Sequence, residues 1–176
     1  MLHHILAQLP LDFPLPIVIV QHIAAGFLPG MLDWLSKETA LTLKIGETGD
    51  IPAPGEVCFA PEDEDMAISS NGHILIRRHV ESGRPRRPIT CLFESVARSF
   101  GARAVGILLT GMGSDGAVGL LEMLRSGAQT IVQDRETSTV FGMPAEAIKL
   151  DAAQHVMSPV EITNFIKSLD REQVGA

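Results

Sequence analysis

The sequence predicts an α/β fold in which helices cover both faces of a mostly parallel sheet that also contains one antiparallel hairpin. Two unbroken apolar runs, at residues 17–20 and 105–109, are typical of strands buried on both faces. A helical pattern follows each run, as it does where parallel strands are joined by crossover helices. Asn71-Gly72, set between two further apolar runs, is a strong signal for a hairpin turn.

The composition indicates one domain with a sizeable core and narrows the classes of partner. The chain has 176 residues, of which 45% are hydrophobic and 5% aromatic, a mixture that suits parallel strands layered with helices. A net charge of −7 argues against a nucleic-acid partner. The first lysine or arginine is Lys37 and no apolar run could span a bilayer, so we expect a soluble, cytoplasmic protein without membrane insertion.

No metal and no cofactor is expected from the cysteines and histidines. Cys58 and Cys91 form no C-x-x-C pair. Five histidines show no ligand spacing: His3, His4, His73, His79 and His155.

The expected elements follow from apolar spacing and from turn residues. Strands are predicted at 17–20, 41–45, 57–60, 105–109, 130–133 and 155–157, and the hairpin at 66–68 and 73–76. Helices are predicted at 2–9, 27–37 and 89–100, from 116 onward, behind Pro144, and after Ser158. Ser158 and Glu161 have the spacing of a capping box.

The turn between the strand at 105–109 and the next helix is a candidate site. Backbone N–H groups point outward at such a turn, and the helix dipole there favours negative charge. Residues 111–116 fit G-x-G-x-x-G, and Asp134 closes the next strand, which is the pattern of a dinucleotide site. Asp115 would however repel the pyrophosphate, which favours a role for it as a helix N-cap or as a partner of a histidine. His22 follows the strand at 17–20, at the edge where α/β proteins bind ligands.

Four segments carry a resemblance to a known family. They are Ile17-Val-Ile-Val-Gln-His22, Phe59-Ala-Pro61, Leu108-Leu-Thr-Gly-Met-Gly-Ser-Asp-Gly116 and Val140-Phe-Gly-Met-Pro144. Together they resemble, in order and over nearly the whole chain, the catalytic domain of the chemotaxis protein-glutamate methylesterases, the CheB family. The resemblance implies a three-layer α/β/α sandwich with a doubly wound sheet. It also implies hydrolysis of glutamyl methyl esters on the cytoplasmic helices of chemoreceptors or a similar protein, with glutamine deamidation in some members.

The resemblance also assigns roles in a serine-triad mechanism. His22 is then the general base, Asp115 orients it, and the backbone N–H of Met112 stabilises the oxyanion. We expect His22 and Asp115 to form a hydrogen bond of about 2.6–3.2 Å, and the strands at 17–20 and 105–109 to be neighbours. The second imidazole nitrogen is expected to face a cleft that the Met112 N–H also borders.

Several features depart from the family pattern. The Gly-x-Ser-x-Gly-Gly motif of the family's nucleophile is absent, and so is the receiver domain, so we expect residues 1–176 to be a single methylesterase domain truncated at its N-terminus. Ser114 is no substitute, because it adjoins Asp115. The family's Arg-Pro-Ser-x-Asp corresponds to Arg86-Arg-Pro-Ile-Thr90 here.

These departures leave open what the chain does. Arg84, Arg86 and Arg87 form either a solvated loop or a weak substrate contact. The alternatives to an esterase are a catalytically inactive CheB-like binding protein and the dinucleotide-binding domain described above.

Overall fold

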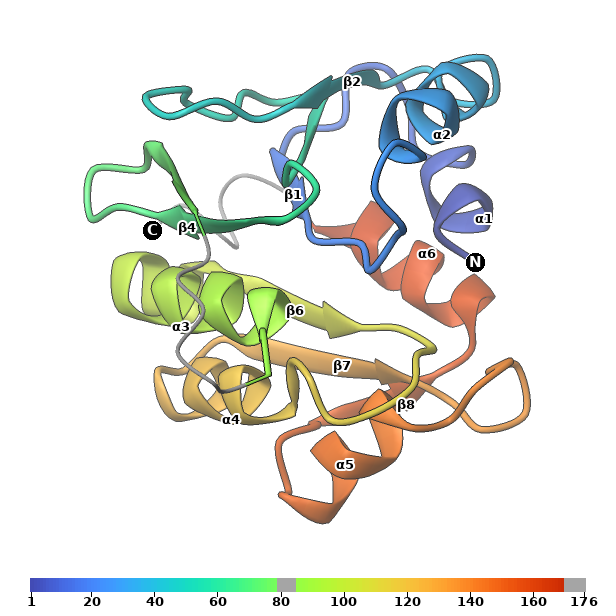
Figure 1. The fold of residues 1–176 in the computed structure, drawn as a ribbon. Coiled ribbons are helices and arrows are strands. Elements are labelled where there is room, and N and C mark those ends of the chain that lie inside the picture. Colours follow the sequence, from blue (N-terminus) through green and yellow to red (C-terminus); the bar gives the residue numbers. More distant parts are fainter. Residues whose placement is uncertain (79–84, 170–176) are drawn as a thin grey trace.

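A computed structural model of the chain describes residues 1–78 and 85–169, in which helices and strands are both present and β2 to β5 follow one another without a helix between them (Figure 1). The strands are β1 (Ile17–Ile19), β2 (Thr42–Ile45), β3 (Glu56–Phe59), β4 (Glu64–Ile68), β5 (Ile74–Arg78), β6 (Val105–Leu108), β7 (Gln129–Gln133) and β8 (His155–Met157). The helices are α1 (Leu2–Leu6), α2 (Leu28–Leu35), α3 (Pro88–Phe100), α4 (Ala117–Arg125), α5 (Met143–Lys149) and α6 (Pro159–Ser168), with a 3-10 turn η1 (Gly101–Arg103). The predicted elements are therefore present, with boundaries that differ by a few residues.

The strands form two parallel sheets of three and one antiparallel hairpin. The first sheet has the order β1-β3-β2 and the second has the order β6-β7-β8, while β4 pairs with β5 around the predicted Asn71-Gly72 turn. The predicted α/β class, its parallel strands and its hairpin are thus confirmed. The expected pairing of β1 with β6 is wrong, because within the described residues each is the edge strand of its own sheet.

Helices cover both faces of the strands, because successive side chains on each strand point to opposite faces. Ile107 and Ile131 belong to a core packed with residues of α1, α2 and α6, whereas Leu108 and Val132 belong to a core packed with residues of α3, α4 and α5. The first group of helices lies at the right of the view in Figure 1, and α3 and α4 lie at the lower left. No helix among the described residues is long and apolar enough to cross a membrane.

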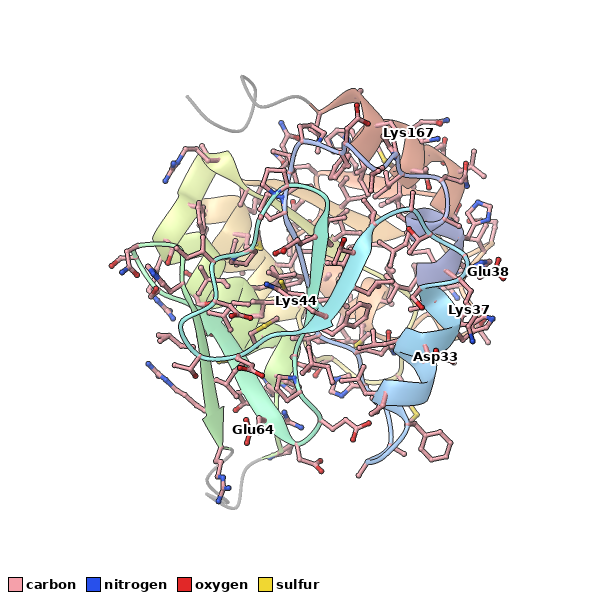
Figure 2. All side chains as sticks on the ribbon, turned by 90° about the horizontal axis from the view of Figure 1, so that it is seen from above. Asp33, Lys37, Glu38, Lys44, Glu64 and Lys167 are labelled. Carbon is pink, nitrogen blue, oxygen red and sulfur yellow. The ribbon has the colours of Figure 1, made fainter. Side chains whose placement is uncertain are left out.

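Local sequence signals set several of the element ends. Ser158 and Glu161 form the predicted capping box at the start of α6, each bonding the backbone N–H of the other. Helix α1 is shorter than predicted, because after Leu6 the chain tightens into hydrogen bonds to the third residue back. Asp33 of α2 and Lys37, which lies just after the end of that helix, form an exposed ion pair of 2.8 Å (Figure 2).

Helix α4 lies unusually close to the first turns of α3 at Gly119. A Cβ at this position would be 2.8 Å from the Thr90 carbonyl oxygen and 2.8 Å from Phe93 Cβ, both closer than normal contacts. Gly30 in α2 is the contrasting case, because a Cβ there would meet nothing within 4 Å. The approach of α4 to α3 therefore depends on the absence of a side chain at residue 119.

We expect Gly119→Ala to lower the free energy of unfolding by about 1–3 kcal/mol, because the added methyl must push α4 away from the α3 backbone. Gly30→Ala is the matched control. It is expected to leave the stability unchanged or to raise it by up to about 1 kcal/mol, because alanine favours a helix over glycine. Urea unfolding of both variants measures the difference. Equal effects from the two substitutions would contradict the tight approach.

Candidate active site

His22 and Asp115 meet at the carboxyl ends of the two parallel sheets. His22 lies three residues after β1, and Asp115 lies in the turn between β6 and α4. The distance from His22 Nε2 to Asp115 Oδ2 is 2.8 Å, within the range expected from the sequence. The histidine side chain is 50% exposed and the aspartate side chain 9%. His22 thus faces solvent, and the buried Asp115 holds it in place through the hydrogen bond.

The Asp115 carboxylate accepts four hydrogen bonds. Oδ2 accepts from His22 and from the Ile89 N–H (3.1 Å), and Oδ1 accepts from the Thr90 N–H (3.0 Å) and the Thr90 hydroxyl (2.9 Å). Burial raises the pKa of Asp115, but the hydrogen bonds from His22, Thr90 and Ile89 outweigh it, and the pKa lies below its ordinary value. The carboxylate is therefore held in its charged form.

Asp115 caps a helix, but a different helix from the one that follows it in sequence. Ile89 and Thr90 are in the first turn of α3, where backbone N–H groups have no partner within the helix. The N-cap residue of α4 is instead Gly116, which has no side chain to act as a cap. Because the helix dipole of α3 favours negative charge at this end, the same contacts stabilise the carboxylate.

Met112 lies in the turn of residues 110–116, which is held by the segment before α5. The Gly111 N–H donates to the Val140 carbonyl, and the Gly111 carbonyl accepts from the N–H groups of Gly142 and Met143. A Cβ at Gly142 would lie 2.7 Å from the Gly111 oxygen, so this contact requires glycine. Within residues 1–78 and 85–169, the Met112 N–H has no hydrogen-bond acceptor. A fixed turn thus presents an unused backbone donor three residues before Asp115.

A small hollow adjoins His22 on the side of β3. It is lined by Val20, Gln21, His22, Ile23, Ala60, Pro61, Glu62, Asp63, Glu64, Arg86 and Pro88. Met112 is not among the residues that line this hollow, and the expectation that its N–H borders the cleft faced by the imidazole stays a prediction. The hollow forms where the residues after β1 meet those after β3, whereas Met112 follows β6.

The three candidate arginines differ in position. Arg86 lines the hollow, and its guanidinium is held by Asp65 Oδ1 (2.9 Å) and by the carbonyl of Glu64, the first residue of β4 (labelled in Figure 2). Arg87 is exposed at the start of α3. Arg84 lies outside the described residues. Of the described arginines, Arg86 is thus the one placed beside His22.

Glu62 was not singled out from the sequence, yet it fixes the loop that follows His22. Its carboxylate accepts hydrogen bonds from the backbone N–H groups of Gly26 and Leu28, at the start of α2. These bonds lower the pKa of Glu62. Its partners are more than thirty residues away in sequence, so only the packing of β3 beside β1 reveals the contact.

No cluster of three or more histidine, cysteine, aspartate or glutamate side chains suited to a metal ion occurs in the part of the chain that the structure describes. What the site does contain is a half-exposed histidine with a buried carboxylate behind it. Such a pair accepts a proton from an attacking group and stabilises the resulting imidazolium.

Comparison with known proteins shows which family the chain resembles. A family model described as CheB methylesterase matches residues 1–166. A protein-glutamate methylesterase/protein-glutamine glutaminase from Geobacter metallireducens is 45% identical over 173 residues, which cover 98% of this chain and 50% of that protein. A protein of the same description from Methanospirillum hungatei is 38% identical over 172 residues, which cover 98% of this chain and 49% of that protein. The chain thus spans about half the length of these relatives.

A solved structure extends the match to three dimensions. The crystal structure of the Thermotoga maritima CheB methylesterase catalytic domain superposes with a TM-score of 0.87 at 31% sequence identity. The match covers 94% of this chain and 89% of that chain. By family model, sequence and fold, the chain belongs to the CheB methylesterase family.

Proposed function

We propose that this chain provides the catalytic histidine and aspartate of a protein-glutamate methylesterase. The substrates are glutamyl methyl esters on the cytoplasmic helices of methylated chemoreceptors or on a similar protein. The observation that carries the proposal is the 2.8 Å hydrogen bond between His22 and the buried Asp115 carboxylate, formed between elements of two different sheets. The names of the relatives add protein-glutamine glutaminase, and we extend the proposal to glutamine side chains.

The geometry assigns a direction to proton transfer. Because His22 Nε2 is bonded to an ionised carboxylate, the proton resides on Nε2, and Nδ1 is left to accept the proton of the nucleophile. Asp115 then stabilises the imidazolium. The Met112 N–H supplies a hydrogen bond to the tetrahedral oxyanion. Ester and amide carbonyls pass through the same kind of tetrahedral intermediate, so one site serves both reactions.

The nucleophile is proposed to be a serine in a segment that lies between β1 and β6. The facing edges of β1 and β6 carry no ladder hydrogen bonds within the described residues. The apolar residues 17–20 are all only partly buried, unlike the central strand β7, where Ile131 and Val132 are fully buried. An extended segment between these edges would satisfy their backbone groups and bury their side chains. A serine at its carboxyl end would lie beside His22.

One observation favours an inactive binding protein as the second candidate. Among the described residues, no serine, threonine or cysteine side chain bonds to His22. The dinucleotide alternative is weaker, because the Gly116 N–H at the start of α4 already donates to the Thr90 hydroxyl. A pyrophosphate at this turn would also meet the charged Asp115.

The two candidates are separated by comparing the 176-residue chain with a chain extended upstream. We expect the 176-residue chain to release negligible methanol from methylated receptor fragments, because a triad without its serine loses nearly all of its effect. A chain extended upstream by a segment that contains Gly-x-Ser-x-Gly-Gly is expected to be active. In the extended chain, His22→Ala is expected to lower kcat by about 10³-fold or more. Replacement of the exposed His4 by alanine is the control and should have no effect.

Strong, His22-dependent methanol release by the 176-residue chain would contradict the assignment of the nucleophile. An inactive extended chain that is folded would favour the binding protein instead. Circular dichroism of each protein checks that it is folded.

Asp115→Asn in the extended chain is expected to lower kcat by about 10⁴-fold, because a neutral amide neither fixes the tautomer of His22 nor stabilises its imidazolium. The control is Asp33→Asn on the exposed face of α2. Steady-state methanol release measures both variants. A loss below about tenfold for Asp115→Asn would show that Asp115 serves only as a cap of α3.

A further inference from the structure

We propose that Thr90 is a positioning residue whose hydroxyl sets the charge and the orientation of Asp115, and so acts on His22 through it. This inference rests on the proposed function, because it concerns the same dyad. The role is assigned to a residue at the start of α3 whose hydroxyl bonds Asp115 and Gly116 and not His22.

The hydroxyl of Thr90 makes two hydrogen bonds of opposite sense. Its oxygen accepts the Gly116 N–H at 2.9 Å, and the hydroxyl donates to Asp115 Oδ1 at 2.9 Å. Because Gly116 occupies the oxygen as a donor, the hydroxyl hydrogen is free to point at the carboxylate. The direction of this bond is therefore fixed by the backbone of the neighbouring turn and does not depend on solvent.

The surroundings of Thr90 leave little room for a water molecule to take the place of its hydroxyl against Asp115 Oδ1. Thr90 and Asp115 are each 8% exposed. Gly119 brings α4 against the Thr90 backbone, and a Cβ at Gly116 would lie 2.7 Å from Ile89 and from Leu108 side-chain atoms. Among the described residues, His22 is the one titratable side chain bonded to the carboxylate. The other three donors all come from Ile89 and Thr90.

Each donor on the carboxylate favours its charged form. Removal of the hydroxyl leaves the two backbone donors and His22, so the carboxylate keeps its place but holds its proton more tightly. The hydroxyl also ties Asp115 to Gly116, the residue that ends the turn carrying Met112. One side chain thus connects the carboxylate of the dyad to the proposed oxyanion turn.

The test is the acid titration of the Asp115 carboxyl in the 176-residue chain, followed by ¹³C NMR in Thr90→Val and Thr90→Ser. Thr90→Val is expected to raise the pKa of Asp115 by about one pH unit, because a charged acceptor loses one donor. Thr90→Ser retains the hydroxyl and should titrate as the unchanged chain does. The control is Ser95→Ala, which removes another buried hydroxyl of α3, one that bonds Leu92 and Ile68 and makes no contact with Asp115.

The methylesterase activity of the extended, serine-containing chain provides a second test of the role of Thr90. Thr90→Val is expected to lower kcat about tenfold with little change in KM, and Thr90→Ser to restore it. The titration needs no nucleophile, so failure of the proposed function would leave the titration result standing. An unchanged Asp115 titration in Thr90→Val would overturn the inference while leaving the esterase proposal intact.

Folding of the variants is checked by urea unfolding, with Thr90→Ala as a second variant that removes the hydroxyl without adding a methyl in its place. If Thr90→Val does not fold, the titration is read from Thr90→Ala with the same expected shift. Failure of both to fold, while Thr90→Ser folds, would show that the hydroxyl is structural and would overturn the positioning role.

Discussion

The site depends on keeping the Asp115 carboxylate charged inside the protein. An uncompensated buried charge costs several kcal/mol, so such a group needs close and well-directed donors. Three of its four hydrogen bonds come from the first turn of α3 and the fourth from His22. The residues after β1, the start of α3 and the turn before α4 must therefore converge on one side chain.

Glycines at helix and turn contacts make this convergence possible. Gly119 lets α4 lie against the backbone of Thr90, and Gly142 lets the segment before α5 lie against the Gly111 carbonyl. Each contact brings two backbones together with no side chain between them. The dyad and the proposed oxyanion turn are consequently held by rigid elements, which is what a preorganised electrostatic site requires.

The parts of the fold that could be predicted from sequence are those with a local physical signal. The capping box of Ser158 and Glu161 and the Asn71-Gly72 hairpin depend on residues a few positions apart. The meeting of His22 with Asp115 was predicted from the family resemblance, and the strand pattern added only that each lies at the carboxyl end of a strand. Thr90 and Glu62 gave no such signal, because their partners lie 25 to 36 residues away and packing alone brings them together. The pairing of β1 with β6 was predicted wrongly for the same reason, since strand partners are chosen by packing.

The unequal burial of the two dyad residues gives the site its direction. Asp115 is enclosed and bonded on both oxygens, so it cannot turn toward a substrate, whereas half of the His22 side chain is exposed. We therefore propose that the reaction takes place on the His22 side, toward the edges of β1 and β6 that carry no ladder hydrogen bonds among the described residues. In that proposal, a nucleophile held along those edges would reach His22 Nδ1 without disturbing the buried carboxylate. The same asymmetry is the basis for the proposed role of Thr90, which lies away from the exposed face and would act on the chemistry through the charge and orientation of Asp115.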